Sequence, residues 1–144
     1  MSVDEVRQAS DQFYAALRQG IGGDPSAMFD VCSHGDDVTT MHPIGGRQVG
    51  WSEVRSIWDM AAHAMTGGNV EVTDLHITML GQDGAYTIGT ETATTIVEGK
   101  PVSFSARCTN VYRREAGGWK IVHHHADLAP NAEAAFHDAV ASAN

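Results

Sequence analysis

The sequence predicts an α+β fold in which a strongly bent, cone-shaped antiparallel sheet wraps around N-terminal helices, with a further helix at the C-terminus. Apolar residues recur at helical spacing in the first part of the chain, whereas from Val70 they alternate with a period of two. Short connections that contain glycine separate the alternating runs, which favours consecutive antiparallel hairpins. Helices followed by a meander of strands are typical of an α+β arrangement rather than of a parallel α/β sheet.

The first expected helix runs from about Val3 to Leu17 and ends at the glycine cluster that follows. A short second helix opens at Asp24-Pro25, because aspartate caps helix N-termini and proline suits the first turn. The third helix is capped by Ser52 or Gly50, ends at Gly67-Gly68, and carries the clearest apolar stripe in the chain. The stripe consists of Val54, Ile57, Trp58, Ala61, Ala62 and Met65.

A short strand is expected from Asp37 to His42, closed by Pro43 and Gly45-Gly46. The four long strands that follow span about Val70–Leu80, Ala85–Val97, Pro101–Arg113 and Trp119–Asp127. Pro130 and Asn131 start the final helix. A bent sheet of this kind leaves a pocket between itself and the early helices, and that pocket is the expected binding site.

Length and charge exclude several classes of function. The 144 residues suit one domain over positions 1–144. The net charge of −9 disfavours nucleic acid and anionic membranes as partners, and basic residues cluster only at Arg113-Arg114. No apolar run is long enough to span a bilayer, and the N-terminus lacks the apolar core of a secretory signal, so a cytoplasmic protein is expected. Cys32 and Cys108 are then expected to be free, buried thiols.

Two segments carry a resemblance to a known family. The stretch from Arg107 to Asp127 resembles the last hairpin of SnoaL-like domains: a strand ending in basic residues, a glycine turn, a Trp, aliphatic residues and an H-x-H motif. It is also similar to the association domain of calcium/calmodulin-dependent kinase II. His42-Pro43-Ile44-Gly45 matches the turn that precedes the third helix in such domains. The resemblance extends over essentially the whole chain and implies the cone fold of the SnoaL-like, nuclear transport factor 2-like superfamily, which includes ketosteroid isomerase.

This resemblance does not imply a single activity. Such domains host isomerases, dehydratases, cyclases, epoxide hydrolases and non-enzymatic assembly modules, so function has to be argued from the site. The chain also departs from the kinase association domain, which has arginines at the positions of Thr109 and Ala126. An anion pocket of that type would therefore need Arg107 as a replacement.

The three histidines of the last strand are divided between two faces, because alternate side chains of a strand point to opposite sides. We expect His123 and His125 to share a face with Trp119 and Ile121, and His124 to share the other with Val122 and Ala126.

An H-x-H pair can bind a metal only with a third ligand, such as His42 or His76. Because the family has this motif in proteins without a metal role, a structural role against a partner subunit is favoured. No metal or cofactor is expected, and a metal-dependent enzyme that uses histidines is kept as a minority alternative.

His124 becomes an acid–base group if its face is the concave one. Arg107, and with it Thr109, are expected on that same face and are candidates for substrate binding. A buried arginine needs a carboxylate or an anionic ligand, and Glu91 is the nearest candidate. A purely structural Arg107–Glu91 ion pair and a binding role both remain open. His42, beside the glycine-rich turn, is either a pocket residue or a cap of that turn.

Two functions follow from these candidates. The first is a cofactor-independent isomerase, dehydratase or cyclase that moves a proton next to a carbonyl in an apolar cavity. His124 or His42 is its base, and Glu91 is the only acid within a strand core. Arg107 or Tyr14 stabilises the oxyanion. Trp58 lines the cavity in this hypothesis, although aromatic residues at helical spacing also fit a plain core.

The second is a non-enzymatic ligand-binding or assembly module built on the same cone. Both hypotheses include a homodimer. The last strands carry apolar residues on both faces, so helices should cover one face and a second copy the outer face.

Overall fold

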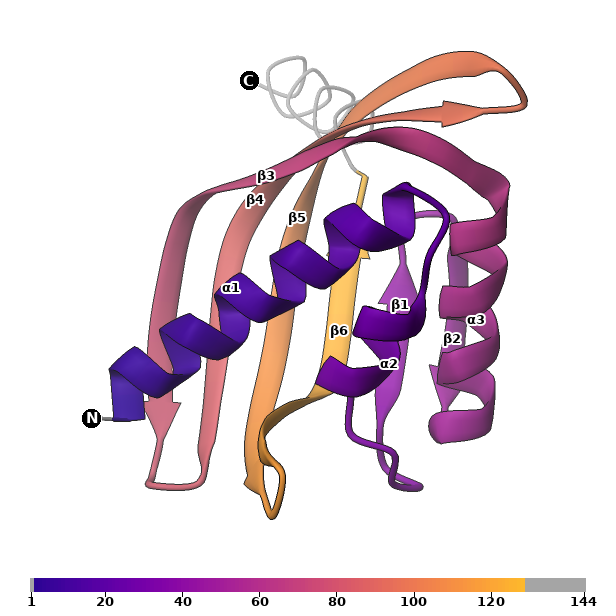
Figure 1. Cartoon of the computed structure of the whole chain (residues 1–144). Coiled ribbons are helices and arrows are strands. Elements are labelled where there is room, and N and C mark those ends of the chain that lie inside the picture. The colour runs from indigo at the N-terminus through magenta and orange to yellow at the C-terminus, as the bar shows by residue number, and fades with distance from the viewer. Residues whose placement is uncertain (1, 129–144) are drawn as a thin grey trace, which may run out of the picture.

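The computed structural model describes residues 2–128 and has the predicted α+β architecture, in which three helices pack on one side of a bent six-stranded sheet (Figure 1). The helices are α1 (Ser2–Ile21), α2 (Ser26–Val31) and α3 (Trp51–Ala64). The strands are β1 (Thr39–His42), β2 (Gly45–Val49), β3 (Met65–Leu80), β4 (Gly84–Val97), β5 (Lys100–Glu115) and β6 (Gly118–Asp127). The helix expected from Pro130 lies outside the described residues.

The sheet has the strand order β2-β1-β6-β5-β4-β3. All neighbours are antiparallel except β1 and β6, which run parallel and bring Thr40 opposite His124. The three long hairpins follow the predicted meander, whereas the β1–β6 pair joins segments more than 80 residues apart and has no local signal. This pairing carries the early strand into the sheet, so residues of β1 and β6 share the concave face.

Helix α1 crosses the concave face of the sheet because one of its sides is apolar (Figure 1). Val6 and Phe13 are fully buried in the main core, where they pack with Trp58 of α3 and Tyr112 of β5. Burial of a side chain such as Phe13 stabilises the fold by roughly 2–3 kcal/mol relative to an exposed position. The core therefore lies between α1, α3 and the sheet, as expected for a cone wrapped around its helices.

Strand β2 was not predicted. Gly45 and Gly46, interpreted as the end of the first strand, instead begin a second one, with φ angles of 99° and 83°. The third helix starts after Gly50 as expected but ends at Ala64. Gly67 and Gly68 lie within β3, in an irregular stretch of its pairing with β4. Glycines that favour turns also serve at bulges, so the sequence alone could not separate the two uses.

A bulge changes the side-chain alternation of β6. Val111 pairs with His123 but the next residue, Tyr112, pairs with Ile121, so Val122 is an extra residue on β6. Ile121 is consequently buried on the same side as His124. The expectation that Ile121 shares a face with His123 and His125 is wrong, because it assumed unbroken alternation.

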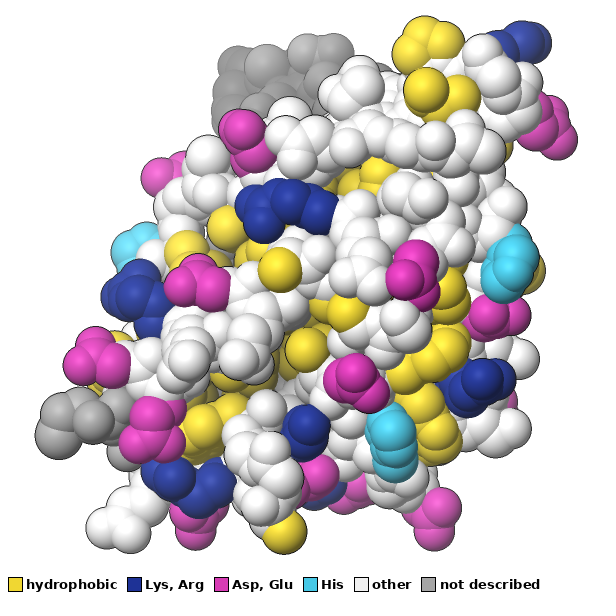
Figure 2. All heavy atoms as spheres, viewed as in Figure 1, with side chains coloured by type: hydrophobic (Ala, Val, Ile, Leu, Met, Phe, Trp, Pro, Cys, Tyr) yellow, Lys and Arg dark blue, Asp and Glu magenta, His cyan; other side chains and the backbone are white. Residues whose placement is uncertain are grey.

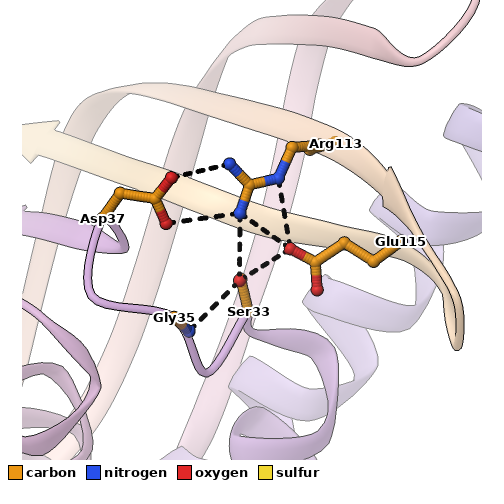
Figure 3. A network of polar contacts seen from close by, with 5 residues as sticks. All are labelled: Ser33, Gly35, Asp37, Arg113 and Glu115. Atoms are coloured by element: carbon orange, nitrogen blue, oxygen red, sulfur yellow. Dashed lines mark hydrogen bonds and ion pairs between the residues drawn. The ribbon is translucent and has the colours of Figure 1, made fainter.

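The loop between α2 and β1 is fastened to the end of β5 by Arg113 (Figure 3). Its guanidinium donates to both carboxylate oxygens of Asp37 at 2.7 and 3.3 Å, to Glu115 at 2.8 and 3.2 Å, and to Ser33. Ser33 donates in turn to Glu115. A planar guanidinium suits such a fork of carboxylates. The network therefore fixes the position of the loop that leads into β1 relative to the end of β5.

Among residues 2–128, the helical side of the molecule carries no gathered basic patch. Acidic and basic side chains are scattered there, and apolar groups appear in the seams between the helices (Figure 2). None of the helices within residues 2–128 combines the length and the apolar character that crossing a membrane requires.

Candidate active site

An apolar cavity of about 390 Å³ lies between the concave face of the sheet, the C-terminal half of α1, and α3. Its walls are aliphatic and aromatic, with Leu17 and Ile21 from α1 and Phe104 from β5 among them. Three titratable side chains also line it: His42 of β1, Glu91 of β4 and His124 of β6. Three candidates chosen from sequence therefore meet in one cavity, although they come from three strands that are distant in the chain.

The titratable groups lie at two levels along the sheet wall of the cavity. Along β4 the side chains that face the cavity are Glu91, Ala93, Thr95 and Val97, and from β6 and the residue that follows it they are His124, Ala126 and Leu128. Because β4 and β6 are both antiparallel to β5, they run in the same direction, but the two rows are offset. His124 pairs with Asn110 of β5, whereas Glu91 pairs with Ala106, four residues earlier in β5, so Glu91 lies farther along the wall than His124.

Glu91 is buried, with 6% of its surface exposed. The Tyr14 hydroxyl donates to Glu91 Oε2 at 2.8 Å, and the Cys108 thiol also lies in hydrogen-bonding reach of the carboxyl group. Burial raises the pKa of Glu91 above its ordinary value, against the opposing effect of these two donors. Burial likewise raises the pKa of Tyr14, so the phenol keeps its proton and acts as a donor.

His124 is buried, with 3% of its surface exposed, and its tautomer follows from its contacts. Nδ1 lies 2.7 Å from Asn110 Oδ1 and 3.8 Å from Cys108 Sγ. With Asn110 in this orientation its amide oxygen can only accept, so Nδ1 carries the hydrogen and Nε2 keeps the lone pair. Burial holds the pKa of His124 well below its ordinary value, with a smaller contribution from His42. The imidazole is therefore a neutral base.

His42 stands beside this base. Its ring centroid lies 5.3 Å from that of His124 and 4.6 Å from that of Trp58, to which it is perpendicular. Burial lowers the pKa of His42 to about 4. Trp58 lines the same end of the cavity with 7% of its surface exposed, and its indole nitrogen has no hydrogen-bond partner within residues 2–128.

Arg107 and Thr109 lie on the opposite face of the sheet from Glu91. Arg107 donates to both carboxylate oxygens of Asp127 at 2.8 and 3.1 Å, and both side chains are substantially exposed. The expected Arg107–Glu91 contact is therefore wrong, and neither Arg107 nor Thr109 faces the cavity. The error is one of parity: in β5 the residues that point inward are Cys108 and Asn110.

Sequence reasoning consequently missed Cys108 and Asn110 as partners of the candidate groups. Their signal was present, since both alternate with Arg107 and Thr109 along one strand. Arg107 was placed on the inner face, with Glu91 as its partner. A small thiol and an amide, however, suit a buried face better than an arginine does. Tyr14, predicted to bind the substrate, instead donates to Glu91 and is not among the residues that line the cavity.

His123 and His125 lie on the outer face, with ring centroids 6.2 Å apart. His123 Nδ1 contacts the Thr39 hydroxyl at 2.7 Å. Of their two proposed third ligands, His42 lines the cavity on the other side of the sheet, whereas His76 lines a hollow of the outer face together with His125. Within residues 2–128 no group of three or more His, Cys, Asp or Glu side chains is placed to hold a metal ion.

Comparisons with known proteins agree with this architecture. Residues 6–129 match the sequence profile of the SnoaL-like domain. A candidate dehydratase of the NTF2-like family from Streptomyces avermitilis is 25% identical, with a TM-score of 0.77 over 88% of this chain and 95% of that one. An NTF2-like superfamily protein from Salmonella enterica is 17% identical, with a TM-score of 0.76 over 87% and 89% of the two chains, a likeness of fold alone.

A third solved structure is a candidate calcium/calmodulin-dependent protein kinase type II association domain from Thiobacillus denitrificans. It is 31% identical, with a TM-score of 0.70 over 83% of this chain and 91% of that one. No curated protein sequence gives a significant match.

Proposed function

Because the chain belongs to the SnoaL-like domain family, we propose that it is a cofactor-independent acid–base enzyme, an isomerase, dehydratase or cyclase acting on a carbonyl-bearing small molecule. One observation carries the proposal: Glu91 and His124 line the same apolar cavity, and burial shifts their pKa values toward the uncharged forms of both. A neutral imidazole is suited to act as a base, and a carboxyl group whose pKa is raised is suited to act as an acid.

His124 Nε2 is the base of the proposed reaction, because Nδ1 donates its hydrogen to Asn110 Oδ1. It removes a proton from the carbon next to the carbonyl, and the electron pair of that C–H bond moves toward the carbonyl oxygen. Glu91 donates its proton to the oxygen that gains charge or leaves. In a dehydration the C–O bond breaks and water departs, which leaves an imidazolium and a carboxylate. Transfer of one proton from His124 back to Glu91 restores both groups.

Tyr14 and Cys108 act on Glu91 and not on the substrate. Both donate toward its carboxyl group, so they fix its orientation and oppose the rise in its pKa caused by burial. A carboxyl group without these donors would hold its proton more tightly and be a weaker acid. His42, beside His124, adds no charge to the cavity at neutral pH because its pKa is about 4.

The test is proton exchange, which needs no knowledge of the natural substrate. Apolar ketones are incubated with the protein in deuterated buffer, and loss of the signal from protons next to the carbonyl is followed by NMR. We expect catalysed exchange with the wild-type protein, and at least a hundredfold slower exchange with His124→Gln and Glu91→Gln.

Matched controls are Glu71→Gln and His63→Gln, which change the same residue types at exposed positions. They should exchange at the wild-type rate. Equal rates in all variants, or exchange no faster than in buffer, would remove the enzyme proposal.

The alternative is a binding or assembly module without turnover. It is favoured by the likeness to the candidate kinase association domain. The same experiment separates the two, because a module of this kind binds a ketone without accelerating exchange.

A further inference from the structure

We infer that the buried Cys108 thiol is a positioning residue whose single hydrogen bond changes partner with the ionisation of Glu91. While Glu91 is protonated, the S–H group donates to Asn110 Oδ1, the atom that also accepts the Nδ1 hydrogen of His124. When Glu91 is ionised, the S–H group donates to the carboxylate instead. The inference deepens the proposed function, on which its consequence for catalysis rests, whereas the change of partner follows from the contacts of Cys108 itself.

Cys108 lies between the candidate acid and the candidate base. On the inner face of β5, Ala106 pairs with Glu91 of β4 and Asn110 pairs with His124 of β6, and Cys108 is the inward residue between them. Its Sγ lies 3.7 Å from Asn110 Oδ1 and 3.8 Å from His124 Nδ1, and the carboxyl group of Glu91 is within hydrogen-bonding reach. Only 4% of its surface is exposed, so its acceptor is one of these protein groups.

The thiol has one hydrogen for two acceptors. Burial, with a smaller contribution from the charge of Glu91, raises the pKa of Cys108, so the hydrogen stays on the sulfur. A hydrogen bond to an ionised acceptor is roughly twice as strong as one between neutral groups. An ionised Glu91 therefore draws the S–H group away from the Asn110 amide oxygen, and a protonated Glu91, which is a weaker acceptor, lets it return.

The titratable groups that face the thiol come from three elements: Tyr14 of α1, Glu91 of β4 and His124 of β6. Burial raises the pKa of Tyr14, so the phenol remains a neutral donor to Glu91 in both states. His42, next to His124, is uncharged above its pKa of about 4, and no lysine or arginine lines the cavity among the described residues. In the resting protein, Glu91 is therefore the group whose ionisation redirects the thiol.

The change of partner favours the charged state of the proposed reaction, in which His124 is an imidazolium and Glu91 a carboxylate. In that state the S–H group donates to the carboxylate, and the sulfur lone pairs face the Nδ1–H group of the imidazolium. Asn110 Oδ1, no longer shared with the thiol, accepts the Nδ1 hydrogen alone. A rotation about the Cβ–Sγ bond, without transfer of the thiol proton, thus stabilises both charges. Interactions that strengthen only in the charged state lower the barrier.

The first arm of the test follows the S–H stretching bands by infrared spectroscopy across a pH titration, while the carboxyl band of Glu91 reports its ionisation. Burial raises the pKa of Cys32 to about 12, so both thiols stay protonated, and Cys32, in the main core, is the internal reference. Cys32→Ala identifies which band belongs to which thiol. We expect the Cys108 band to move to lower frequency as Glu91 ionises, because a stronger acceptor weakens the S–H bond. The Cys32 band should not move.

The matched pair of variants for this arm keeps both cysteines in place, so the bands are compared directly. Glu91→Gln should abolish the shift, whereas Glu71→Gln, the same change at an exposed position of β3, should retain it. A Cys108 band that keeps its frequency at every pH at which the protein is folded, or that moves equally in Glu91→Gln, would overturn the inference.

The second arm tests the consequence for catalysis. Cys108→Ala should slow the exchange of ketone protons by about 10-fold, the weak end of the range for one hydrogen bond to a charged group. The loss should fall on kcat and leave KM nearly unchanged, because Cys108 is not among the described residues that line the cavity. Cys108→Ser keeps a donor and should recover most of the rate. Cys32→Ala should exchange at the wild-type rate, and an equal rate in Cys108→Ala would exclude the catalytic role.

Failure of this inference is distinguishable from failure of the proposed function. Catalysed exchange together with an unmoved Cys108 band would remove the inference and leave the proposed function standing. A Cys108 band that moves with the ionisation of Glu91, without catalysed exchange, would remove the proposed function and leave the change of hydrogen-bond partner standing.

Discussion

The Tyr14 hydroxyl in α1 lies 2.8 Å from Glu91 Oε2 in β4, so one hydrogen bond joins the helix to the candidate acid of the sheet. Both side chains are buried, at 3% and 6% exposure. This bond has two measurable consequences, one for stability and one for the pKa of Glu91.

Tyr14→Phe should lower the free energy of unfolding by about 1–3 kcal/mol, since a buried carboxyl group loses a donor. The bond lowers the pKa of Glu91, so its loss should raise that pKa further. Urea titration measures the first effect. The alkaline limb of the exchange rate, where Glu91 loses its proton, measures the second and should move to higher pH. Tyr86→Phe, on the outer face, is the control; identical behaviour of both variants would contradict the role of Tyr14.

Asn110→Asp should raise the pKa of His124. The substitution places a carboxylate at the position of Oδ1, 2.7 Å from Nδ1, where it stabilises the imidazolium. NMR titration of His124 should show the increase, and the acid limb of the exchange rate should move upward with it. Asn69→Asp, at an exposed position of β3, should leave both unchanged. An unchanged His124 titration in Asn110→Asp would mean that Asn110 does not hold the Nδ1 proton.

Acid should destabilise the fold through the buried histidines. The pKa of His42 falls from 6.5 when unfolded to about 4 when folded, so between these values the unfolded chain binds more protons. The stability contributed by neutral His42 is complete above pH 6.5 and is lost as the pH falls toward 4, by on the order of 3 kcal/mol. His124, whose pKa is lowered in the same direction, adds to the loss.

The measurement is Tm against pH from 7 to 4, compared between the wild type and His42→Phe. The variant keeps a ring against Trp58 but cannot bind a proton, so its Tm should fall less over this range. His63→Gln, at an exposed position, should retain the wild-type slope. A His42→Phe curve parallel to the wild type would contradict the burial effect.

Gly68→Ala should destabilise the protein by several kcal/mol. A Cβ at this position would lie 1.9 Å from the Thr94 carbonyl oxygen, and the φ of +130° disfavours any L side chain. The contact is with backbone of the paired strand, so neither strand can move away without breaking the β3–β4 ladder. Gly20→Ala near the end of α1 meets nothing within 4 Å and should be neutral or slightly stabilising. Thermal unfolding of the pair measures the difference.

Elements with a local pattern repeated over many residues could be predicted from the sequence. The stripe that includes Val54, Trp58 and Ala62 and the period-two runs from Val70 predicted α3 and the four long strands, because both are local patterns repeated over many residues. The sequence left open which face of the last strand is concave, and in the structure His124 and Glu91 both line the concave-face cavity.

Features that depend on one residue were not predictable in this way. The bulge at Val122 reverses the alternation within β6, and no periodic pattern signals a single inserted residue. The misplacement of Arg107 has a different cause: the alternation along β5 is unbroken, and the wrong one of its two faces was taken as the inner one. The parallel pairing of β1 with β6 depends on contacts between distant segments, which a local pattern does not contain.

The outer face of the sheet should form a homodimer. The described helices pack on the concave side (Figure 1), while Ile88 on the outer face is 45% exposed and pairs in register with Thr109 and His76. Ile88 lies on β4, one strand from the β3 edge of the sheet, and a sheet face that the described helices leave uncovered is a surface that a second copy can cover. A stable dimer buries about 800 Å² on each partner, and a two-fold axis would bring Ile88 of each copy into the same interface.

Sedimentation equilibrium should therefore give a dimer for the wild type. Ile88→Glu should give a monomer with an unchanged circular dichroism spectrum, because it places a carboxylate from each copy in one buried contact. Ile44→Glu is the matched control: it is more exposed but lies at the cavity, so it should remain dimeric and lose affinity for apolar ligands instead. A wild-type monomer at all concentrations, or dimers of both variants, would exclude this face as the interface.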